Sequence, residues 1–156
     1  MRLRKPDWFK VPLSNTTAFQ VHRTLRDLYL HTVCREAGCP NIGECFNQGT
    51  ATFLILGEVC TRNCRFCAID SGKSPADPDP EEPMRIAEAV RKMKLQHCVI
   101  TGVNRDDLPD GGAEHYAETI RQVRNLNPNV TIEALTGDFN GLETSLITVL
   151  NSSPDV

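Results

Sequence analysis

Apolar residues along this chain alternate between two kinds of spacing. One continuous apolar run, 51–57, is typical of a strand buried in a parallel sheet, and 97–103 and 129–135 are predicted to be the second and third strands. Three stretches with apolar residues at helical spacing follow them in turn: 86–93, 116–123 and 141–150. Strands and helices that alternate in this way predict an α/β fold with a parallel sheet and right-handed crossovers.

The loops that follow the first two predicted strands contain the candidate functional residues. Functional groups in parallel sheets collect at the carboxyl ends of strands. We therefore predict that the loop containing Cys60 and the loop beginning at Asn104 lie at the same edge of the sheet. Pro154–Val156, after the last predicted helix, is predicted to open a fourth strand.

The first third of the chain lacks this alternation. Residues 1–18 are polar and interrupted by proline, so we predict an extended arm, followed by a short amphipathic helix over 19–30. Between 34 and 49 no period persists, and glycine and proline indicate a loop, which a bound metal would order. We therefore divide the chain into an amino-terminal extension, 1–50, and the α/β part, 51–156.

Composition and charge narrow the class of protein. With 156 residues, 40% of them apolar and 24% charged, the chain fits one globular domain with one hydrophobic core. The formal net charge of −3 argues against nucleic acid as a partner. No apolar run approaches bilayer-spanning length, and the amino terminus lacks the apolar segment of a secretory signal. We expect no membrane association and a cytoplasmic location.

Six of the seven cysteines form two triplets. The first is Cys34, Cys39 and Cys45, and the second is Cys60, Cys64 and Cys67. Three thiols in a short loop hold three corners of a cubic iron–sulfur cluster and leave the fourth iron open to a small molecule, whereas a structural zinc site is closed by four ligands. An odd number of closely spaced thiols favours metal chemistry over disulfides. Cys98, inside a predicted strand, is expected to be a buried apolar side chain.

The spacing Cys-x3-Cys-x2-Cys directly after a first buried strand resembles that of the radical S-adenosylmethionine superfamily. Further motifs resemble those of the lipoyl synthases within it: Cys34-x4-Cys39-x5-Cys45, Pro40–Cys45, Gly49–Phe53, Arg105–Leu108 and Asp110–Gly112. The resemblance implies a partial (β/α) barrel, here truncated after about three βα units, with an amino-terminal cysteine-loop extension over 1–50.

The resemblance also implies a reaction. A 4Fe–4S cluster on the second cysteine triplet would bind S-adenosylmethionine and cleave it to methionine and a 5′-deoxyadenosyl radical. A second, auxiliary 4Fe–4S cluster on the first triplet would give sulfur to C6 and C8 of an octanoyl chain on a lipoyl-carrier domain. A reducing electron donor would be a second partner. Such cofactors supply the difficult chemistry, and the protein orients them and excludes water.

Five residues are implied as contacts of S-adenosylmethionine. Phe66 matches an aromatic position near the adenine, although it could equally pack under the cluster. Thr101 and Gly102 end the second strand, where superfamily members contact the methionine end of the cofactor. Arg105 and Asp107 could position cofactor or substrate by charge-assisted hydrogen bonds, or could satisfy the turn of their own loop.

The chain also departs from the family pattern. Members continue to a six-stranded partial barrel and carry a serine, in an Arg-Ser-Ser-Tyr-type motif, that ligates the auxiliary cluster; Ser152 and Ser153 lack that context. Gly102 and Gly137 stand where we expect Ser and Pro. Three interpretations are open: part of a longer lipoyl synthase, a truncated cluster-binding remnant without catalysis, and a zinc-binding interaction module.

Overall fold

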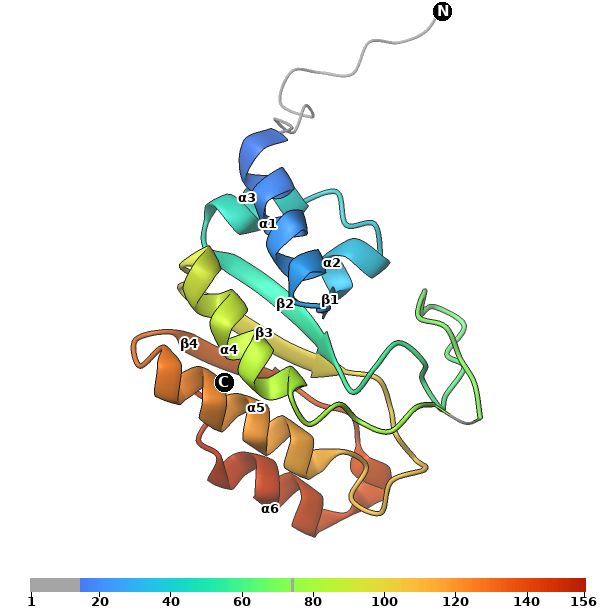
Figure 1. The fold of residues 1–156 in the computed structure, drawn as a ribbon. Coiled ribbons are helices and arrows are strands. Elements are labelled where there is room, and N and C mark those ends of the chain that lie inside the picture. The colour runs from blue at the N-terminus through green and yellow to red at the C-terminus, as the bar shows by residue number, and fades with distance from the viewer. Residues whose placement is uncertain (1–14, 74) are drawn as a thin grey trace, which may run out of the picture.

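A mixed sheet of four strands in the order β1-β2-β3-β4 forms the centre of the molecule (Figure 1). The computed structural model describes residues 15–73 and 75–156. The strands are β1 (His31–Thr32), β2 (Thr50–Ile55), β3 (His97–Gly102) and β4 (Thr131–Leu135). The helices are α1 (Asn15–Asp27), α2 (Val33–Glu36), α3 (Ile42–Asn47), α4 (Glu82–Met93), α5 (Ala113–Leu126) and α6 (Glu143–Asn151), with a 3-10 turn, η2 (Phe139–Gly141).

Strands β2, β3 and β4 are parallel, as the alternating pattern predicts. Phe53 pairs with Ile100, and Ile100 pairs with Ala134, so the three strands are in register. The prediction of a wholly parallel sheet is wrong at one edge, because β1 pairs antiparallel with β2 through His31 and Leu54. The short helices α2 and α3 lie between these two strands and reverse the chain.

Helices α4, α5 and α6 lie side by side over one face of the sheet (Figure 1). Alternate strand residues are buried under them: Ala51, Phe53, Ile55, Cys98, Ile100 and Ile132. Tyr116, Ile120 and Val123, predicted to share one helix face, are all buried in α5. Cys98 is fully buried, as predicted. Strands with an apolar residue at every second position thus pack against helices whose apolar residues recur every 3.6 positions, and together they form one hydrophobic core.

The amino-terminal part differs from its prediction in two places. Helix α1 begins at Asn15, inside the predicted arm; residues 1–14 lie outside the described residues. The stretch 34–49, predicted to be irregular, contains α2 and α3. The Thr32 hydroxyl caps α2 by accepting the Arg35 N–H at 3.3 Å, and Phe46 buries α3 in the core. Such short helices depend on a cap and one buried contact, which leave no apolar period in the sequence.

The last two residues of the chain run beside β4. Ile132 O accepts the N–H of Val156 at 3.2 Å, and Ala134 N donates to Val156 O at 2.9 Å. These two bonds flank Glu133 and have the pattern of one parallel pair. The predicted opening of a fourth strand over Pro154–Val156 therefore has its first hydrogen bonds, although Pro154–Val156 is not assigned as a strand.

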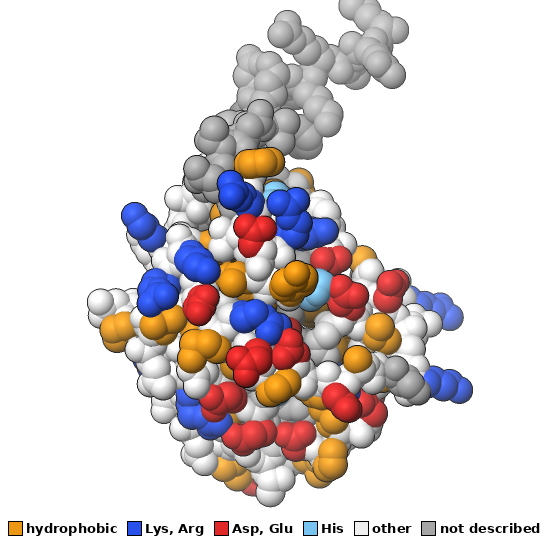
Figure 2. Space-filling model, viewed as in Figure 1, with side chains coloured by type: hydrophobic (Ala, Val, Ile, Leu, Met, Phe, Trp, Pro, Cys, Tyr) orange, Lys and Arg blue, Asp and Glu red, His pale blue; other side chains and the backbone are white. Residues whose placement is uncertain are grey.

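The surface over α1 and α4 carries charges of both signs. Figure 2 shows more Lys and Arg side chains in its upper part, around α1, and more Asp and Glu below. Positive and negative side chains are therefore partly segregated over this face. Among the residues that the structure describes, no helix is both long and apolar enough to cross a membrane.

The backbone turns sharply where β2 ends. The predicted strand extends to Gly57, but β2 stops at Ile55 because Leu56 and Gly57 have φ angles of 72° and 98°. Glu82 accepts the Leu56 N–H at 3.0 Å, and the Arg105 guanidinium donates to Leu56 O at 3.2 Å. Both charged side chains are buried. The turn is therefore held from two sides and sends the next loop out of the sheet.

Replacement of Gly112 tests how closely side chains pack around this turn. Its φ is +89°, and a Cβ there would lie 2.6 Å from Leu56 Cδ1. Gly112→Ala combines a left-handed backbone with overpacking, so we expect a loss of about 3 kcal/mol in the free energy of unfolding. The control Gly141→Ala has a φ of +76° but nothing within 4 Å of a Cβ, and should lose only about 1 kcal/mol. Urea unfolding followed by circular dichroism measures both; equal losses would contradict this packing.

Candidate functional site

The loop that contains Cys60, Cys64 and Cys67 leaves the carboxyl end of β2 and is closed at its base. Cys60 N donates to Asp70 O at 2.8 Å, and Gly72 N donates to Cys60 O at 2.9 Å. Within the loop, Cys67 N donates to Cys64 O at 3.0 Å and forms a tight turn. The hydrogen bonds at the base fix the Cys60 backbone. The tight turn brings the backbone of Cys67 close to that of Cys64.

The three thiols of this loop differ in exposure. Cys60 is partly buried, and its Sγ accepts the N–H of Asn104 at 3.3 Å and of Arg62 at 3.4 Å. Cys64 and Cys67 are exposed, and all three sulfurs are free of disulfides. Three free thiols in one closed loop, one already accepting N–H groups as a thiolate ligand does, fit a cubic iron–sulfur cluster with one open iron.

Thr61 joins this loop to the loop that follows β3. Thr61 N donates to Asn104 O at 3.0 Å, and Asp106 N donates to Thr61 Oγ1 at 3.1 Å. The single hydroxyl proton of Thr61 is shared between Asn104 O, at 2.9 Å, and Asp106 Oδ2, at 3.0 Å. The predicted meeting of the two loops at one sheet edge is therefore confirmed.

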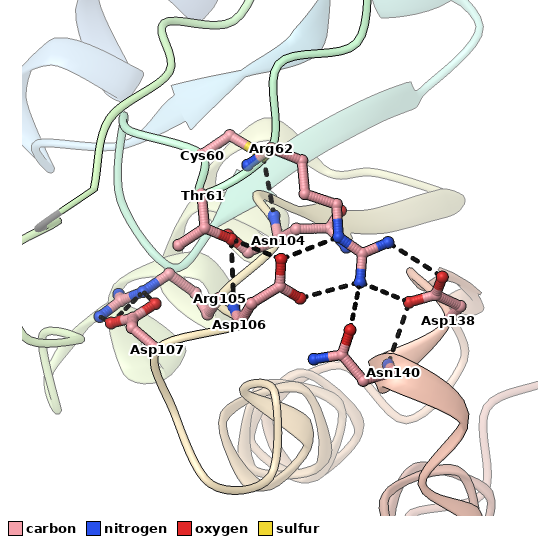
Figure 3. Close-up of polar contacts among 9 residues, drawn as sticks. All are labelled: Cys60, Thr61, Arg62, Asn104, Arg105, Asp106, Asp107, Asp138 and Asn140. Atoms are coloured by element: carbon pink, nitrogen blue, oxygen red, sulfur yellow. Dashed lines mark hydrogen bonds and ion pairs between the residues drawn. The ribbon is translucent and has the colours of Figure 1, made fainter.

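Arg62 extends the connection to the loop after β4 (Figure 3). Its Nε and Nη2 donate to the two carboxylate oxygens of Asp106 at 2.9 and 2.8 Å, and its Nη1 and Nη2 donate to those of Asp138 at 2.9 and 2.8 Å. Asn140 Oδ1 also lies 2.8 Å from Nη2, so the two hydrogens of Nη2 are shared among three acceptors. One guanidinium thus makes two bidentate carboxylate contacts, the strongest arrangement open to it.

The charges of this cluster shift one another's pKa. Hydrogen bonds from Arg62 lower the pKa of Asp138 to about 2 and lower the pKa of Asp106. Hydrogen bonds to Asp106 and then Asp138 raise the pKa of Arg62. All three groups are therefore charged near neutral pH.

The Arg105 side chain contacts the Leu56 turn and a residue of its own loop. Its side chain is 1% exposed, and it donates to Leu56 O and, from Nε and Nη2, to Asp107 at 2.9 and 2.8 Å. Hydrogen bonds from Arg105 lower the pKa of Asp107. This geometry matches the alternative in which the loop satisfies its own charges. Contact of Arg105 and Asp107 with the cofactor stays a prediction.

The remaining predicted cofactor contacts lie along the same edge. Phe66 is 93% exposed in the outer part of the Cys60 loop, so it does not pack on the core. Thr101 Oγ1 donates to Leu135 O at 2.9 Å. At Gly102 a Cβ would lie 2.8 Å from the Tyr116 hydroxyl, so this glycine allows Tyr116 its position. The assignment of these residues to the cofactor stays a prediction.

The upstream triplet is spread over α2, the next turn and α3. Cys34, Cys39 and Cys45 are all partly buried and free of disulfides. Burial, and then the proximity of Cys34 and Cys39, raise the pKa of the Cys45 thiol. Three free thiols are the ligand type that iron–sulfur clusters take, and binding of a second cluster by this triplet stays a prediction.

His31 lies between the two cysteine loops. Its Nε2 is 3.1 Å from Glu58 Oε1, and its Nδ1 is 3.7 Å from Glu36 Oε1. Glu58 lies just before Cys60, and Glu36 lies between Cys34 and Cys39. A cavity of about 160 Å³ at this point is lined by both segments: His31, Glu36, Leu54, Glu58 and residues 68–70. The described lining of this cavity therefore comes from residues next to the two triplets and includes none of the six cysteines.

No three His, Cys, Asp or Glu side chains of the described ranges 15–73 and 75–156 converge as ligands of a single metal ion. A cubic cluster is larger than one ion, and its ligands stand further apart than those of a zinc ion.

Sequence reasoning missed most of the residues that hold the Cys60 loop. Thr61 and Arg62 lie between two predicted ligands, but nothing in the sequence indicates their partners. Asp138 and Asn140 follow β4 in a turn, 76 and 78 positions from Arg62. The one available signal was topological, because all three loops follow the carboxyl ends of successive parallel strands.

Comparisons with known proteins agree with this geometry. A family model described as the Radical SAM superfamily matches residues 54–149, from β2 to α6, including the whole Cys60–Cys67 loop. The chain therefore belongs to the radical S-adenosylmethionine superfamily, enzymes that use an iron–sulfur cluster and S-adenosylmethionine. The prediction made from the cysteine spacing is confirmed.

Within this class the chain is similar to proteins named lipoyl synthase. It is 56% identical to that of Chlorobaculum tepidum over 98% of this chain and 53% of the relative. It is 53% identical to that of Chlorobium limicola over 99% of this chain and 53% of the relative, and 51% identical to that of Shewanella baltica over 97% and 48%. The chain spans about half the length of the curated relatives it matches.

Thiol labelling tests the predicted difference in reactivity between the exposed and the buried cysteines. Burial raises the pKa of Cys98 to about 12, whereas Cys64 and Cys67 are exposed. In the anaerobic, iron-free chain, we expect iodoacetamide to modify Cys64 and Cys67 at least about tenfold faster than Cys98, because only an accessible thiolate reacts. Peptide mass spectrometry measures the rates. The difference should vanish in urea, and a native Cys98 that reacts as fast as Cys64 would contradict the structure.

Acidification tests the Arg62 ion pairs. Because the folded-state pKa values of Asp106 and Asp138 lie below their ordinary 3.8, both carboxylates stabilise the fold at higher pH and lose that contribution on protonation. We expect the free energy of unfolding of the iron-free chain to fall between pH 3.8 and about 2, where Asp138 titrates. Arg62→Gln should make that fall shallower. Parallel curves for the two proteins in urea titrations would rule out this contribution.

Proposed function

We propose that this chain is the cluster-binding part of a lipoyl synthase, which inserts two sulfur atoms at C6 and C8 of a protein-bound octanoyl group. Similarity to lipoyl synthases over nearly the whole chain supports this class of reaction. The observation that carries the proposal is the pair of cysteine triplets, whose six thiols are all free of disulfides and whose neighbouring residues Glu36 and Glu58 both contact His31. Two triplets, each suited to a cluster, are what a radical initiator and a separate sulfur donor need.

Each triplet has a distinct task in this proposal. A cluster on Cys60, Cys64 and Cys67 with bound S-adenosylmethionine supplies the electron that yields methionine and the 5′-deoxyadenosyl radical, and a cluster on Cys34, Cys39 and Cys45 supplies the sulfur atoms. Residues of the chain orient these groups. The exposed outer part of the Cys60 loop faces solvent with Cys64 and Cys67, so the open iron can meet a small molecule there.

The partners follow from the same reaction. The octanoyl chain is presented by a lipoyl-carrier domain or protein, and a reducing electron donor returns each initiating electron. We place the reaction in the cytoplasm, without nucleic acid or a membrane. Thr101 and Gly102 at the end of β3, Phe66 in the cysteine loop, and Arg105 with Asp107 are the proposed contacts of S-adenosylmethionine.

Reconstitution tests the proposal. After anaerobic loading with iron and sulfide, the chain should hold about eight irons, as two 4Fe–4S clusters do. Replacing Cys60, Cys64 and Cys67 by Ala should remove about half of the iron and abolish formation of 5′-deoxyadenosine from S-adenosylmethionine with dithionite. Replacing Cys34, Cys39 and Cys45 by Ala should remove the other half and leave that cleavage in place.

Product analysis separates sulfur insertion from its alternatives. With an octanoylated carrier domain, mass spectrometry should detect a lipoyl product with the parent chain and none with either triple variant. Two clusters and S-adenosylmethionine cleavage without any lipoyl product would favour a non-catalytic remnant. A colourless chain that holds stoichiometric zinc after anaerobic preparation would favour the zinc module and contradict the proposal.

A further inference from the structure

Cys60 differs from the other thiols of its loop in being held before any cluster is bound. Its Sγ accepts two backbone N–H groups, from Asn104 and Arg62. Among the residues that the structure describes, neither Cys64 nor Cys67 accepts a hydrogen bond at sulfur, and both are exposed. The loop therefore consists of one fixed thiol and two exposed ones.

The two N–H donors are themselves held by side chains (Figure 3). The Arg62 backbone is anchored through its guanidinium, which bonds both oxygens of Asp106 and both oxygens of Asp138. The Asn104 backbone is anchored through its carbonyl oxygen, which accepts the N–H and the hydroxyl of Thr61. We call this set of residues, Thr61, Arg62, Asp106 and Asp138, the loop clamp.

We propose that Thr61 and Arg62 are positioning residues for the radical-initiating cluster: the loop clamp presents Cys60 as its preformed corner, and the Asn104 and Arg62 N–H groups raise the cluster's reduction potential. The inference rests on cluster binding by the Cys60 loop and is independent of the sulfur-insertion step. The other two thiols then complete the site when the cluster assembles.

The physical basis lies in the charge of a reduced cluster. One-electron reduction adds negative charge to the cluster and its ligating sulfurs, and N–H groups directed at a ligand sulfur stabilise that charge. Their effect requires a fixed direction, because a flexible loop would lose the alignment. Bidentate contacts between a guanidinium and two carboxylates supply this rigidity across three loops.

Arg65 provides a matched control for Arg62. It is an arginine of the same loop, also between two of the cysteines, and it is exposed. Among the described residues it makes no hydrogen bond or ion pair, unlike Arg62. Arg62→Gln and Arg65→Gln remove the same charge at a similar distance along the chain from the ligands, so the difference between the two variants isolates the clamp.

The experiment uses the full chain with Cys34, Cys39 and Cys45 replaced by Ala, so that the Cys60 loop alone binds iron. Each protein is reconstituted anaerobically and poised in a redox titration, and the reduced cluster is quantified by electron paramagnetic resonance. For Arg62→Gln we expect about a tenfold lower ratio of reduced to oxidised cluster at a given potential, which is about 59 mV for one electron. Arg65→Gln should change the ratio by less than about twofold.

Asp138→Asn and Arg62→Lys guard against a variant that fails to fold. Asp138 lies outside the cysteine loop, so its loss weakens one side of the clamp only, and we expect about a threefold change in the ratio. Arg62→Lys keeps the positive charge but not the planar guanidinium that makes bidentate contacts. Its ratio of reduced to oxidised cluster should lie between those of the parent and Arg62→Gln. Asp138→Asn added to Arg62→Gln should have no further effect, because the contact is already gone.

The outcomes separate this inference from the proposed function. Equal potentials for Arg62→Gln, Arg65→Gln and the parent would overturn the clamp alone. A clamp effect together with a chain that forms no lipoyl product would overturn the proposed function alone. A parent chain that takes up no iron would contradict the cluster site on which both rest.

Discussion

The architecture of the site depends on how the chain leaves β2 at Leu56. Its backbone adopts a φ of 72° and is fixed by Glu82 on its N–H and by Arg105 on its carbonyl oxygen. His115 lies 2.7 Å from the same Glu82 oxygen, and Arg105 is neutralised by Asp107. Buried charges are tolerated only with such partners, so these contacts fix the direction of the loop that follows.

The Cys60 loop that follows this turn has two parts, and only one of them is held by contacts with other loops. The base of the Cys60 loop is tied to the loops after β3 and β4 through Thr61 and Arg62, and the outer part, with Cys64 and Cys67, is exposed. The proposed cluster site would use both parts, with Cys60 as a fixed ligand and Cys64 and Cys67 as accessible ligands that complete it. The same division leaves solvent access where an open iron would bind its small molecule.

Prediction from the sequence succeeded where a local pattern reports a local structure or a family motif. The apolar periods located three strands and three covering helices, and the spacing of Cys60, Cys64 and Cys67 identified the superfamily. It failed where short elements depend on single contacts, as in α2 and α3, and where the antiparallel β1 pairs for only two residues. Such elements are too short to produce a period.

By itself, the sequence determined the types of candidate ligand, their grouping and the order of the βα units, because thiol spacing and hydrophobic period are properties of neighbouring residues. Only the tertiary structure decided what those ligands meet. Arg62 reaches Asp138 across 76 positions, and His31 contacts both Glu36, in the first cysteine segment, and Glu58, just before the second. Parallel pairing of β2, β3 and β4 makes these contacts possible, because it places the loops after successive strands at one edge.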